Sequence, residues 1–253
     1  MQIDLSNKTA LITGASGDLG RVMVRTLAGC GASVAIHYHS NQAKAEALRE
    51  ELSTLGTRAM IVQADVGEQN DILRMRDEVG STLGAPDIIV NNAVSQYDWK
   101  TVLNQPIEDY EGQFRSIILH NVLMAQAFVP AMIEKKWGRV IAINTECAIQ
   151  CAPTQSAYVS GKRGMDGVLR VLAREVGEHG ITVNQVAPGW TISDRDRTDG
   201  TELKPEYSAN VPLRRRGEDQ DIANAVAWLA SDWAGYVTGA FLPVCGGNVM
   251  TAI

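Results

Sequence analysis

Short apolar segments alternate with segments of helical pattern along all 253 residues, and this alternation is the strongest constraint on the fold. The apolar segments predict strands over residues 9–13, 33–37, 58–63, 87–91, 139–144, 182–186 and 240–244. Helices are predicted over residues 18–29, 41–55, 69–83, 107–136, 155–177 and 218–231. Strands that are apolar throughout and separated by helices form parallel sheets covered on both faces. We therefore predict one α/β domain, 1–253, with a doubly wound parallel sheet of about seven strands.

Residues 188–217 are the one long segment for which no helix or strand is predicted. The segment is charged, with alternating acids and arginines at 194–197 and three arginines at 214–216. Irregular segments of this length are often functional, and this one follows the carboxyl end of a predicted strand. We predict that it is a lid over the site; the alternative is a solvated, charged loop.

Charge and composition favour a small-molecule partner. The net charge of −6 argues against a nucleic acid or an anionic membrane as the main partner. No apolar run approaches the roughly 18 residues of a membrane span, and the chain enters a strand almost at once, without a signal-peptide pattern. The four cysteines have neither disulfide nor metal-ligand spacing, so we expect reduced thiols, a cytoplasmic protein and no metal site.

A glycine-rich turn, TGASGDLG, occupies residues 13–20. Gly14 directly follows the first predicted strand, and Gly20 lies within the first predicted helix. Glycines let the backbone approach a pyrophosphate, which binds at the positive end of a helix. The turn therefore predicts a dinucleotide site in a Rossmann fold, and the alternative is a plain tight turn.

Tyr158 and Lys162 lie four residues apart in a predicted helix, so their side chains share one face. A neighbouring ammonium favours phenolate and lowers a phenol pKa that is otherwise about 10. This pair predicts an acid/base catalyst; the alternative is an amphipathic helix with one aromatic and one surface lysine. Thr145, a hydroxyl donor, directly follows the predicted strand 139–144.

Taken in chain order, these residues resemble the short-chain dehydrogenase/reductase family over essentially the whole chain, with the 3-oxoacyl-carrier-protein reductase-like members most similar. The matching motifs are the turn at 13–20, Ala64-Asp65-Val66, Asn91-Asn92-Ala93, Asn121, Thr145, Tyr158, Lys162, Val186-Ala187-Pro188-Gly189, Val211-Pro212-Leu213 and Val237-Thr238-Gly239.

The resemblance implies hydride transfer between a nicotinamide cofactor and a carbonyl or secondary alcohol. It implies that Tyr158 is the general acid, that Thr145 donates a second hydrogen bond, and that Lys162 lowers the Tyr158 pKa and holds the nicotinamide ribose. Asn121 would help to hold a water that returns the proton, or would be a buried structural amide.

The resemblance also implies a set of binding residues. The cofactor would contact Gly14, Ser16, Gly17, Asp18, Leu19, Gly20, His39, Ser40, Asn41, Asp65, Val66, Asn92, Ala93, Tyr158, Lys162, Pro188, Gly189, Thr191 and Ser193. The substrate pocket would include Gln96, Tyr97, Trp99, Glu146, Gln150, Gln155 and Trp190. These polar and aromatic side chains suit a small polyol, a sugar or a ring ketone as well as an acyl chain. Lys135, Lys136 and Arg139 could receive a carrier protein.

Several positions depart from the family pattern. Asp18 stands at a usual glycine, which is unfavourable for phosphate unless its side chain caps the helix. Val94 replaces another glycine, Cys245 an aspartate, and Thr145 the usual serine. The first three motivate an alternative function, a non-catalytic nicotinamide-binding sensor or structural paralogue. The set of Thr145, Tyr158 and Lys162 favours an enzyme.

The end of the second predicted strand favours NADP over NAD. An NAD enzyme of this fold places a carboxylate there to bind the ribose hydroxyls. This chain instead has His39, Ser40 and Asn41, which donate hydrogen bonds and do not repel a 2′-phosphate. Dual use of both cofactors is the alternative.

The two longest predicted helices favour a homotetramer. The helix at 107–136 carries apolar residues on more than one face, and Gly161, Gly164 and Gly167 recur in the helix at 155–177. Glycines at this spacing suggest the close approach of another backbone, since each costs up to about 1 kcal/mol in a helix. The alternative is that the sheet and neighbouring helices account for all of this burial. The family resemblance implies that these two helices pair with those of a second copy across one two-fold axis. It also implies that the C-terminal segment, here 249–253, packs across another two-fold axis, which makes a closed tetramer.

Overall fold

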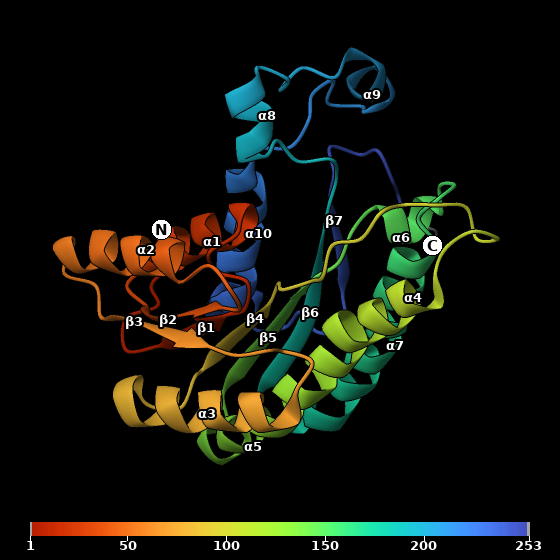
Figure 1. Cartoon of the computed structure of the whole chain (residues 1–253). Coiled ribbons are helices and arrows are strands. Elements are labelled where there is room, and N and C mark those ends of the chain that lie inside the picture. Colours follow the sequence, from red (N-terminus) through yellow and green to blue (C-terminus); the bar gives the residue numbers. More distant parts are fainter. Residues whose placement is uncertain (1, 252–253) are drawn as a thin grey trace.

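The computed structural model describes residues 2–251, which form one parallel sheet of seven strands in the order β3-β2-β1-β4-β5-β6-β7 (Figure 1). The strands are β1 (Thr9–Ile12), β2 (Ser33–Tyr38), β3 (Ala59–Gln63), β4 (Ile88–Asn91), β5 (Gly138–Ile143), β6 (Ile181–Pro188) and β7 (Phe241–Val244). The predicted fold class is confirmed. The strand order reverses between β1 and β4, and open α/β sheets bind ligands at such a point.

Helices cover both faces of the sheet (Figure 1). The helices are α1 (Asp18–Gly29), α2 (Gln42–Thr54), α3 (Gln69–Leu83), α4 (Ile107–Gln113), α5 (His120–Lys135), α6 (Cys147–Gln150), α7 (Ser156–Val176), α8 (Asp194–Asp199), α9 (Pro205–Asn210) and α10 (Asp219–Ala230). Short turns of 3-10 helix are η2 (Gly177–His179) and η3 (Asp232–Ala234). Helices α1, α2 and α10 pack on one face, and α3, α5 and α7 pack on the other.

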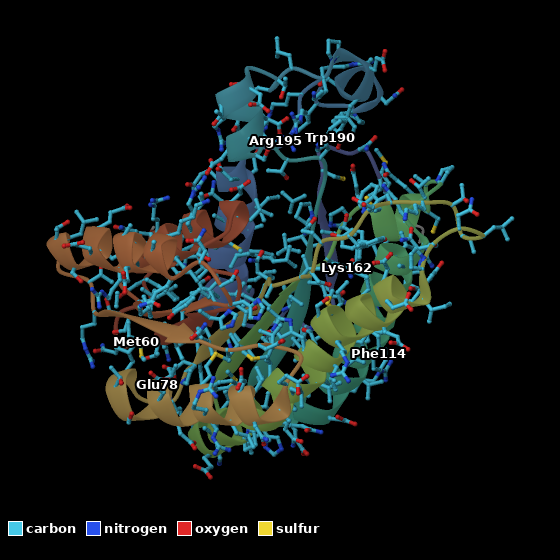
Figure 2. All side chains as sticks on the ribbon, in the orientation of Figure 1. Met60, Glu78, Phe114, Lys162, Trp190 and Arg195 are labelled. Atoms are coloured by element: carbon cyan, nitrogen blue, oxygen red, sulfur yellow. The ribbon has the colours of Figure 1, made fainter. Side chains whose placement is uncertain are left out.

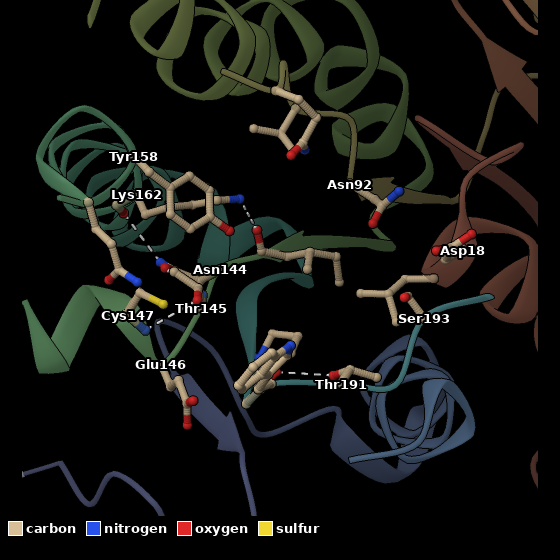
Figure 3. A pocket seen from close by; sticks show the side chains of 18 of the residues that line it. Asp18, Asn92, Asn144, Thr145, Glu146, Cys147, Tyr158, Lys162, Thr191 and Ser193 are labelled. Carbon is tan, nitrogen blue, oxygen red and sulfur yellow. Dashed lines mark hydrogen bonds between the residues drawn. The ribbon is translucent and has the colours of Figure 1, made fainter. Parts of the chain in front are cut away.

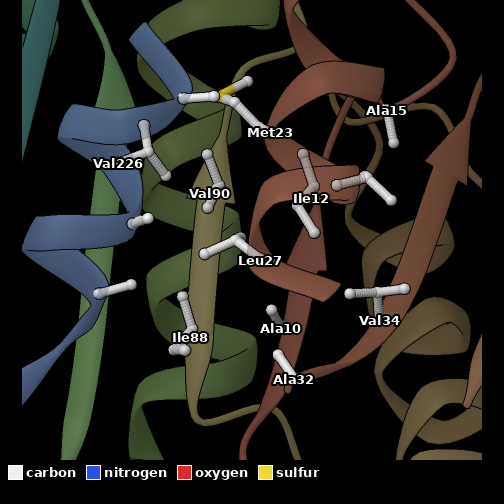
Figure 4. Close-up of a cluster of buried hydrophobic side chains, with 14 of the residues drawn as sticks. Ala10, Ile12, Ala15, Met23, Leu27, Ala32, Val34, Ile88, Val90 and Val226 are labelled. Carbon is white, nitrogen blue, oxygen red and sulfur yellow. The ribbon is translucent and has the colours of Figure 1, made fainter. Parts of the chain in front are cut away.

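Each face of the sheet has its own hydrophobic core, which explains why the strands are apolar throughout. Successive side chains of a strand point to opposite faces. Ile12 therefore packs with Met23 and Val226 under α1 and α10 (Figure 4), whereas Leu11 packs on the opposite side. A strand buried on both faces has few positions for a polar side chain, and a polar residue that does occur there, such as His37 in β2, is hydrogen-bonded.

The predicted helix at 107–136 is interrupted. A π-helical segment, η1 (Phe114–Leu119), begins at the Phe114 labelled in Figure 2 and connects α4 to α5. The helix Ile107–Lys135 is long and apolar enough to cross a membrane by length and composition, because an 18-residue window within it has a mean hydropathy of 1.6. The expectation that no segment approaches this property was therefore wrong. Half of the apolar window is buried inside the protein, and core helices pass the same test.

The glycines of α7 have an explanation within the chain. A Cβ at Gly161 would lie 2.9 Å from Ile117 Cδ1, and a Cβ at Gly164 would collide with Ile118 Cδ1. Both isoleucines belong to η1, so a side chain of the same chain, not another backbone, occupies this space. The interpretation from spacing was wrong for these two positions. Gly167 has nothing within 4 Å.

The segment 188–217 is not irregular as predicted, because it contains α8 and α9. Ser193 and Asp196 form a capping box at the start of α8, and Pro205 begins α9. Each helix has six residues, which is too short to show a periodic apolar pattern. Figure 1 shows both helices above the carboxyl ends of the strands, with α8 near α1.

Candidate active site

A cavity of about 670 Å³ opens where the carboxyl ends of the strands meet the segment 188–217 (Figure 3). Thr145, Tyr158 and Lys162 all line it. So do all seven residues predicted for the substrate pocket, namely Gln96, Tyr97, Trp99, Glu146, Gln150, Gln155 and Trp190. The cavity wall also includes Asp18, Leu19, Asn92, Pro188, Gly189, Thr191 and Ser193 from the predicted cofactor set.

Tyr158 is held by the loop that follows β4. Its ring stacks on Trp99, with centroids 6.3 Å apart, and its backbone N–H donates to the Tyr97 hydroxyl at 2.8 Å. Burial raises the pKa of the Tyr158 phenol. The expected lowering of this pKa by Lys162 is therefore not found in this structure. The lysine Nζ lies 5.6 Å from the ring centroid, and desolvation dominates.

Lys162 is buried, and its Nζ donates to the carbonyl oxygen of Ile143 at 2.5 Å. Burial lowers the pKa of Lys162 to about 7, because a buried ammonium is poorly solvated. The Thr145 hydroxyl oxygen accepts the Cys147 N–H at 3.1 Å. That contact leaves the O–H of Thr145 as a donor toward the cavity.

Asn121 does not line the cavity. It lies in the first turn of α5, directly after the π-helical segment. Its Oδ1 accepts from Asn91 Nδ2 at 2.7 Å, and its Nδ2 donates to the Ile117 carbonyl at 2.8 Å. Both polar atoms of the amide are thus engaged within the chain.

The glycine turn forms a second cavity of about 420 Å³ at the start of α1. It is lined by Gly14, Ser16, Gly17, Asp18, Leu19, Gly20, His37, His39, Ser40, Asn41, Asn92, Ala93, Val94 and Gln96. Gly14 has a φ of +62°, and a Cβ there would lie 3.0 Å from Ala93 Cα. A Cβ at Gly20 would collide with the Gly14 carbonyl. This cavity, which we call the glycine cradle, exposes backbone without side chains and fits a pyrophosphate at a helix N-terminus.

Asp18 and Asp65 occupy unexpected positions. Asp18 is the first residue of α1 and does not cap the helix; instead its Oδ2 accepts the Asp194 N–H at 3.4 Å. Asp65 and its neighbour Val66 line neither cavity. The Asp65 carboxylate nevertheless lies 3.9 Å from His39 Nε2, so β3 brings an acid near a loop that has none of its own.

Sequence reasoning missed His37, which hydrogen-bonds the backbone of the glycine-rich turn. Its Nδ1 accepts the Gly14 N–H at 2.9 Å, so its Nε2 carries the proton and donates to the Ala64 carbonyl at 3.0 Å. Burial lowers the His37 pKa to about 4. A histidine inside an otherwise apolar strand was the available signal.

The His37 contacts predict acid sensitivity. As pH falls from about 6.5 to 4, the unfolded imidazole binds a proton that the folded one does not, so the free energy of unfolding falls. One such residue contributes at most about 1.4 kcal/mol per pH unit. Urea titrations at pH 7.5, 6 and 5 would measure the slope. His37→Asn should make it shallower, while His120, whose pKa is also lowered by burial, keeps titrating. Equal slopes would contradict the assignment.

Sequence reasoning also missed Tyr207 and Asn248, which surround Glu146. The Tyr207 hydroxyl donates to Glu146 Oε1 at 2.9 Å and accepts the Trp190 N–H at 2.8 Å. Asn248 Nδ2 donates to Glu146 Oε2 at 3.0 Å. The Trp190 ring meets the Tyr207 ring edge to face and packs against the buried guanidinium of Arg216. These contacts connect α9 to the cavity wall.

The basic residues considered for a carrier protein lie at the opposite end of the sheet. Arg139 is buried near the start of β5, where it donates to the carbonyls of Gly138 and Ser231. Lys135 donates to Asp87 and to the Ala85 carbonyl before β4. Lys136 follows at the end of α5. These residues therefore do not surround the cavity mouth as expected.

The fold and the site together define a dinucleotide-dependent oxidoreductase of the open α/β class. A family model described as "Enoyl-(Acyl carrier protein) reductase" matches residues 14–248. The chain belongs to the short-chain dehydrogenase/reductase family and is an NAD(P)-dependent oxidoreductase. The resemblance inferred from the motifs is thus confirmed.

Individual relatives are similar over nearly their whole length. The 3-oxoacyl-[acyl-carrier-protein] reductase FabG of Staphylococcus epidermidis is 37% identical, with 96% of this chain and all of the relative covered. The FabG of Escherichia coli (strain K12) is 35% identical, and the match covers 98% of this chain and all of the relative. Among solved structures, a blue fluorescent protein from a metagenomic library in complex with NADPH has a TM-score of 0.89, 34% identity, and coverage of 98% and 100%. A 7α-hydroxysteroid dehydrogenase complexed with NADH and 7-oxo glycochenodeoxycholic acid has a TM-score of 0.89, 30% identity, and coverage of 98% and 96%.

Proposed function

We propose that this protein reduces a carbonyl substrate with NADPH, or oxidises the corresponding secondary alcohol, as a 3-oxoacyl reductase-like enzyme. The observation that carries the proposal is that Thr145, Tyr158 and Lys162 share one cavity, which adjoins the glycine cradle. When bound, the cofactor supplies the hydride, and the chain supplies position and a proton. NADPH oxidation with a panel of ketones tests the proposal; tight NADPH binding without turnover would favour the non-catalytic sensor.

Each residue of the set has a distinct role in this proposal. The Tyr158 hydroxyl protonates the carbonyl oxygen, and the free Thr145 O–H donates a second hydrogen bond as negative charge develops there. Lys162 would hold the nicotinamide ribose. If its ammonium group then donated to the ribose instead of to the Ile143 carbonyl, its positive charge would favour the phenolate of Tyr158. Asn121 would act through its hydrogen bonds to Asn91 of β4 and Ile117 of η1, since its side chain lies outside the cavity wall.

The segment 188–217 would act as a lid within the single domain 1–253. Its helix α8 is joined to α1, the helix that follows the glycine turn, by the ion pair between Arg21 and Asp194. Its helix α9 reaches the catalytic cavity through Tyr207. A lid that contacts both regions would close over cofactor and substrate together and exclude water.

NADP is the cofactor we propose, as in the NADPH-bound structural relative. His39, Ser40 and Asn41 line the cradle, and the side chain of Asp65 does not. We expect a lower Kd for NADPH than for NADH. His39→Asp should raise the Kd for NADPH by about tenfold, because a carboxylate repels the 2′-phosphate. Direct titration of both cofactors measures this.

The matched control for the cofactor prediction is His179→Asp. His179 lies in η2, before the amino end of β6 and away from the cradle. It should leave both Kd values unchanged. A clear NADH preference in the parent protein would contradict the proposal of NADP, and equal Kd values would favour dual use.

We also propose a cytoplasmic homotetramer, with small-molecule or acyl substrates and no nucleic-acid or membrane partner. Tyr110, Phe114, Ile118 and Gly161 line a groove between α4, η1 and α7, and Phe114 is half exposed. The C-terminal segment proposed for the second interface, 249–253, extends beyond the described residues. Light scattering at dilute concentration should give four times the chain mass; a stable monomer would contradict the proposal, and a dimer would mean that one interface forms.

A further inference from the structure

Glu146 is a buried carboxylate in the wall of the catalytic cavity, and the reaction proposed above does not use it. It directly follows Thr145 and is 4% exposed (Figure 3). In the part of the chain that the structure describes, it forms no ion pair. A carboxylate in such a place is costly unless hydrogen-bond donors surround it. Its presence therefore requires a reason.

Two neighbouring side chains orient this carboxylate, and among the described residues they leave part of its capacity to accept hydrogen bonds unused. Tyr207 donates to Oε1 and Asn248 donates to Oε2, whereas two carboxylate oxygens offer about four acceptor positions. Gly189 makes room for the arrangement, because a Cβ there would lie 2.8 Å from the Tyr207 hydroxyl. The donors come from α9 and from the segment after β7, so two elements fix the carboxylate of the residue that follows Thr145 in the chain.

The rest of the cavity wall is unsuited to an anionic group. Among the described residues that line it, Lys162 is the only one with a cationic side chain, and its Nζ donates to the Ile143 carbonyl. Arg216, in the lid, is 1% exposed and is paired with Asp196. Another cation of the lid, Lys204, lies over the Trp190 ring, 5.8 Å from its centroid. Aromatic walls with one carboxylate acceptor suit a compact, neutral molecule that carries a hydroxyl group.

Resting on the proposed reductase function, we propose that Glu146 is a specificity-determining residue. It accepts a hydrogen bond from a substrate hydroxyl next to the reacting carbonyl. The enzyme then favours compact α-hydroxyketones, or the matching vicinal diols in the oxidative direction, over acyl thioesters. A site that hydrogen-bonds a substrate hydroxyl discriminates strongly against the analogue that lacks it, because its buried polar group is then left unpaired.

Matched ketones test this assignment with NADPH as the reductant. We expect the parent enzyme to reduce 2-hydroxycyclohexanone with a kcat/KM at least about tenfold above that for cyclohexanone, and above that for acetoacetyl-CoA. Glu146→Gln should remove most of this preference while changing kcat/KM for cyclohexanone only a few-fold. Glu178→Gln, an exposed acid in η2, is the matched control and should change nothing.

A second variant separates recognition from lid anchoring. Tyr207→Phe removes the hydroxyl that contacts Glu146 and Trp190 but keeps the carboxylate. It should lower kcat/KM for both cyclic ketones alike and preserve most of their ratio. If Glu146→Gln instead behaves like Tyr207→Phe, Glu146 only anchors the lid and the inference is overturned.

Other outcomes also decide the question. A higher kcat/KM for acetoacetyl-CoA than for 2-hydroxycyclohexanone would overturn the assignment of a substrate hydroxyl to Glu146. A higher kcat/KM for the cationic ketone 3-quinuclidinone than for 2-hydroxycyclohexanone would do the same. Either result would leave the reductase function intact. If NADPH binds but no ketone of the panel is reduced, the reductase function fails, and this inference fails with it.

Discussion

Replacing Tyr158 by Phe is expected to lower turnover by about 10²–10⁴-fold while NADPH still binds. The phenol lines the cavity together with Thr145 and is the proposed proton donor, and phenylalanine keeps the ring that stacks on Trp99. The hydrogen bond from the Tyr158 backbone to Tyr97 also remains. Steady-state NADPH oxidation, together with direct titration of the cofactor, measures both parts of this expectation.

The matched control is Tyr236→Phe, since Tyr236 is fully exposed and lies outside both cavities. It should leave turnover and binding unchanged. Activity of Tyr158→Phe within a few-fold of the parent would overturn the assignment of the general acid. Loss of NADPH binding would instead mean that the hydroxyl is needed to hold the cofactor.

Replacing Thr145 by Val is expected to lower turnover by about 10²–10³-fold, whereas Thr145→Ser is tolerated. Valine has a similar size but no donor, and serine keeps the donor. The pair therefore separates hydrogen bonding from packing. The rate of ketone reduction under saturating NADPH is the measurement.

One structural contact must be controlled in this comparison. The Thr145 hydroxyl oxygen also accepts the Cys147 N–H, and an unpaired buried N–H costs about 1–3 kcal/mol of stability. A thermal melt of each variant shows whether the valine protein is folded at the assay temperature. If folded Thr145→Val works as well as Thr145→Ser, Thr145 is a packing residue.

The sequence by itself determined the sheet, most helices and the residues gathered around the cavities. All seven strands and the helix at 69–83 lie where the pattern predicts, because burial on two faces and helical periodicity are local properties of the chain. The glycine turn could be recognised for a similar reason: backbone without side chains is needed directly between a strand and a helix. The site residues were identified from motif order and remain predictions about chemistry.

The tertiary structure alone decided how those residues interact. Burial raises the Tyr158 pKa although a lysine stands four positions away, since desolvation depends on everything packed around the phenol. Glu146 is separated by 61 residues from Tyr207 and by 102 from Asn248. Contacts between residues so far apart in the chain produce no periodic pattern in the sequence. They arise only when the sheet brings the ends of its strands together and the segment 188–217 folds over them.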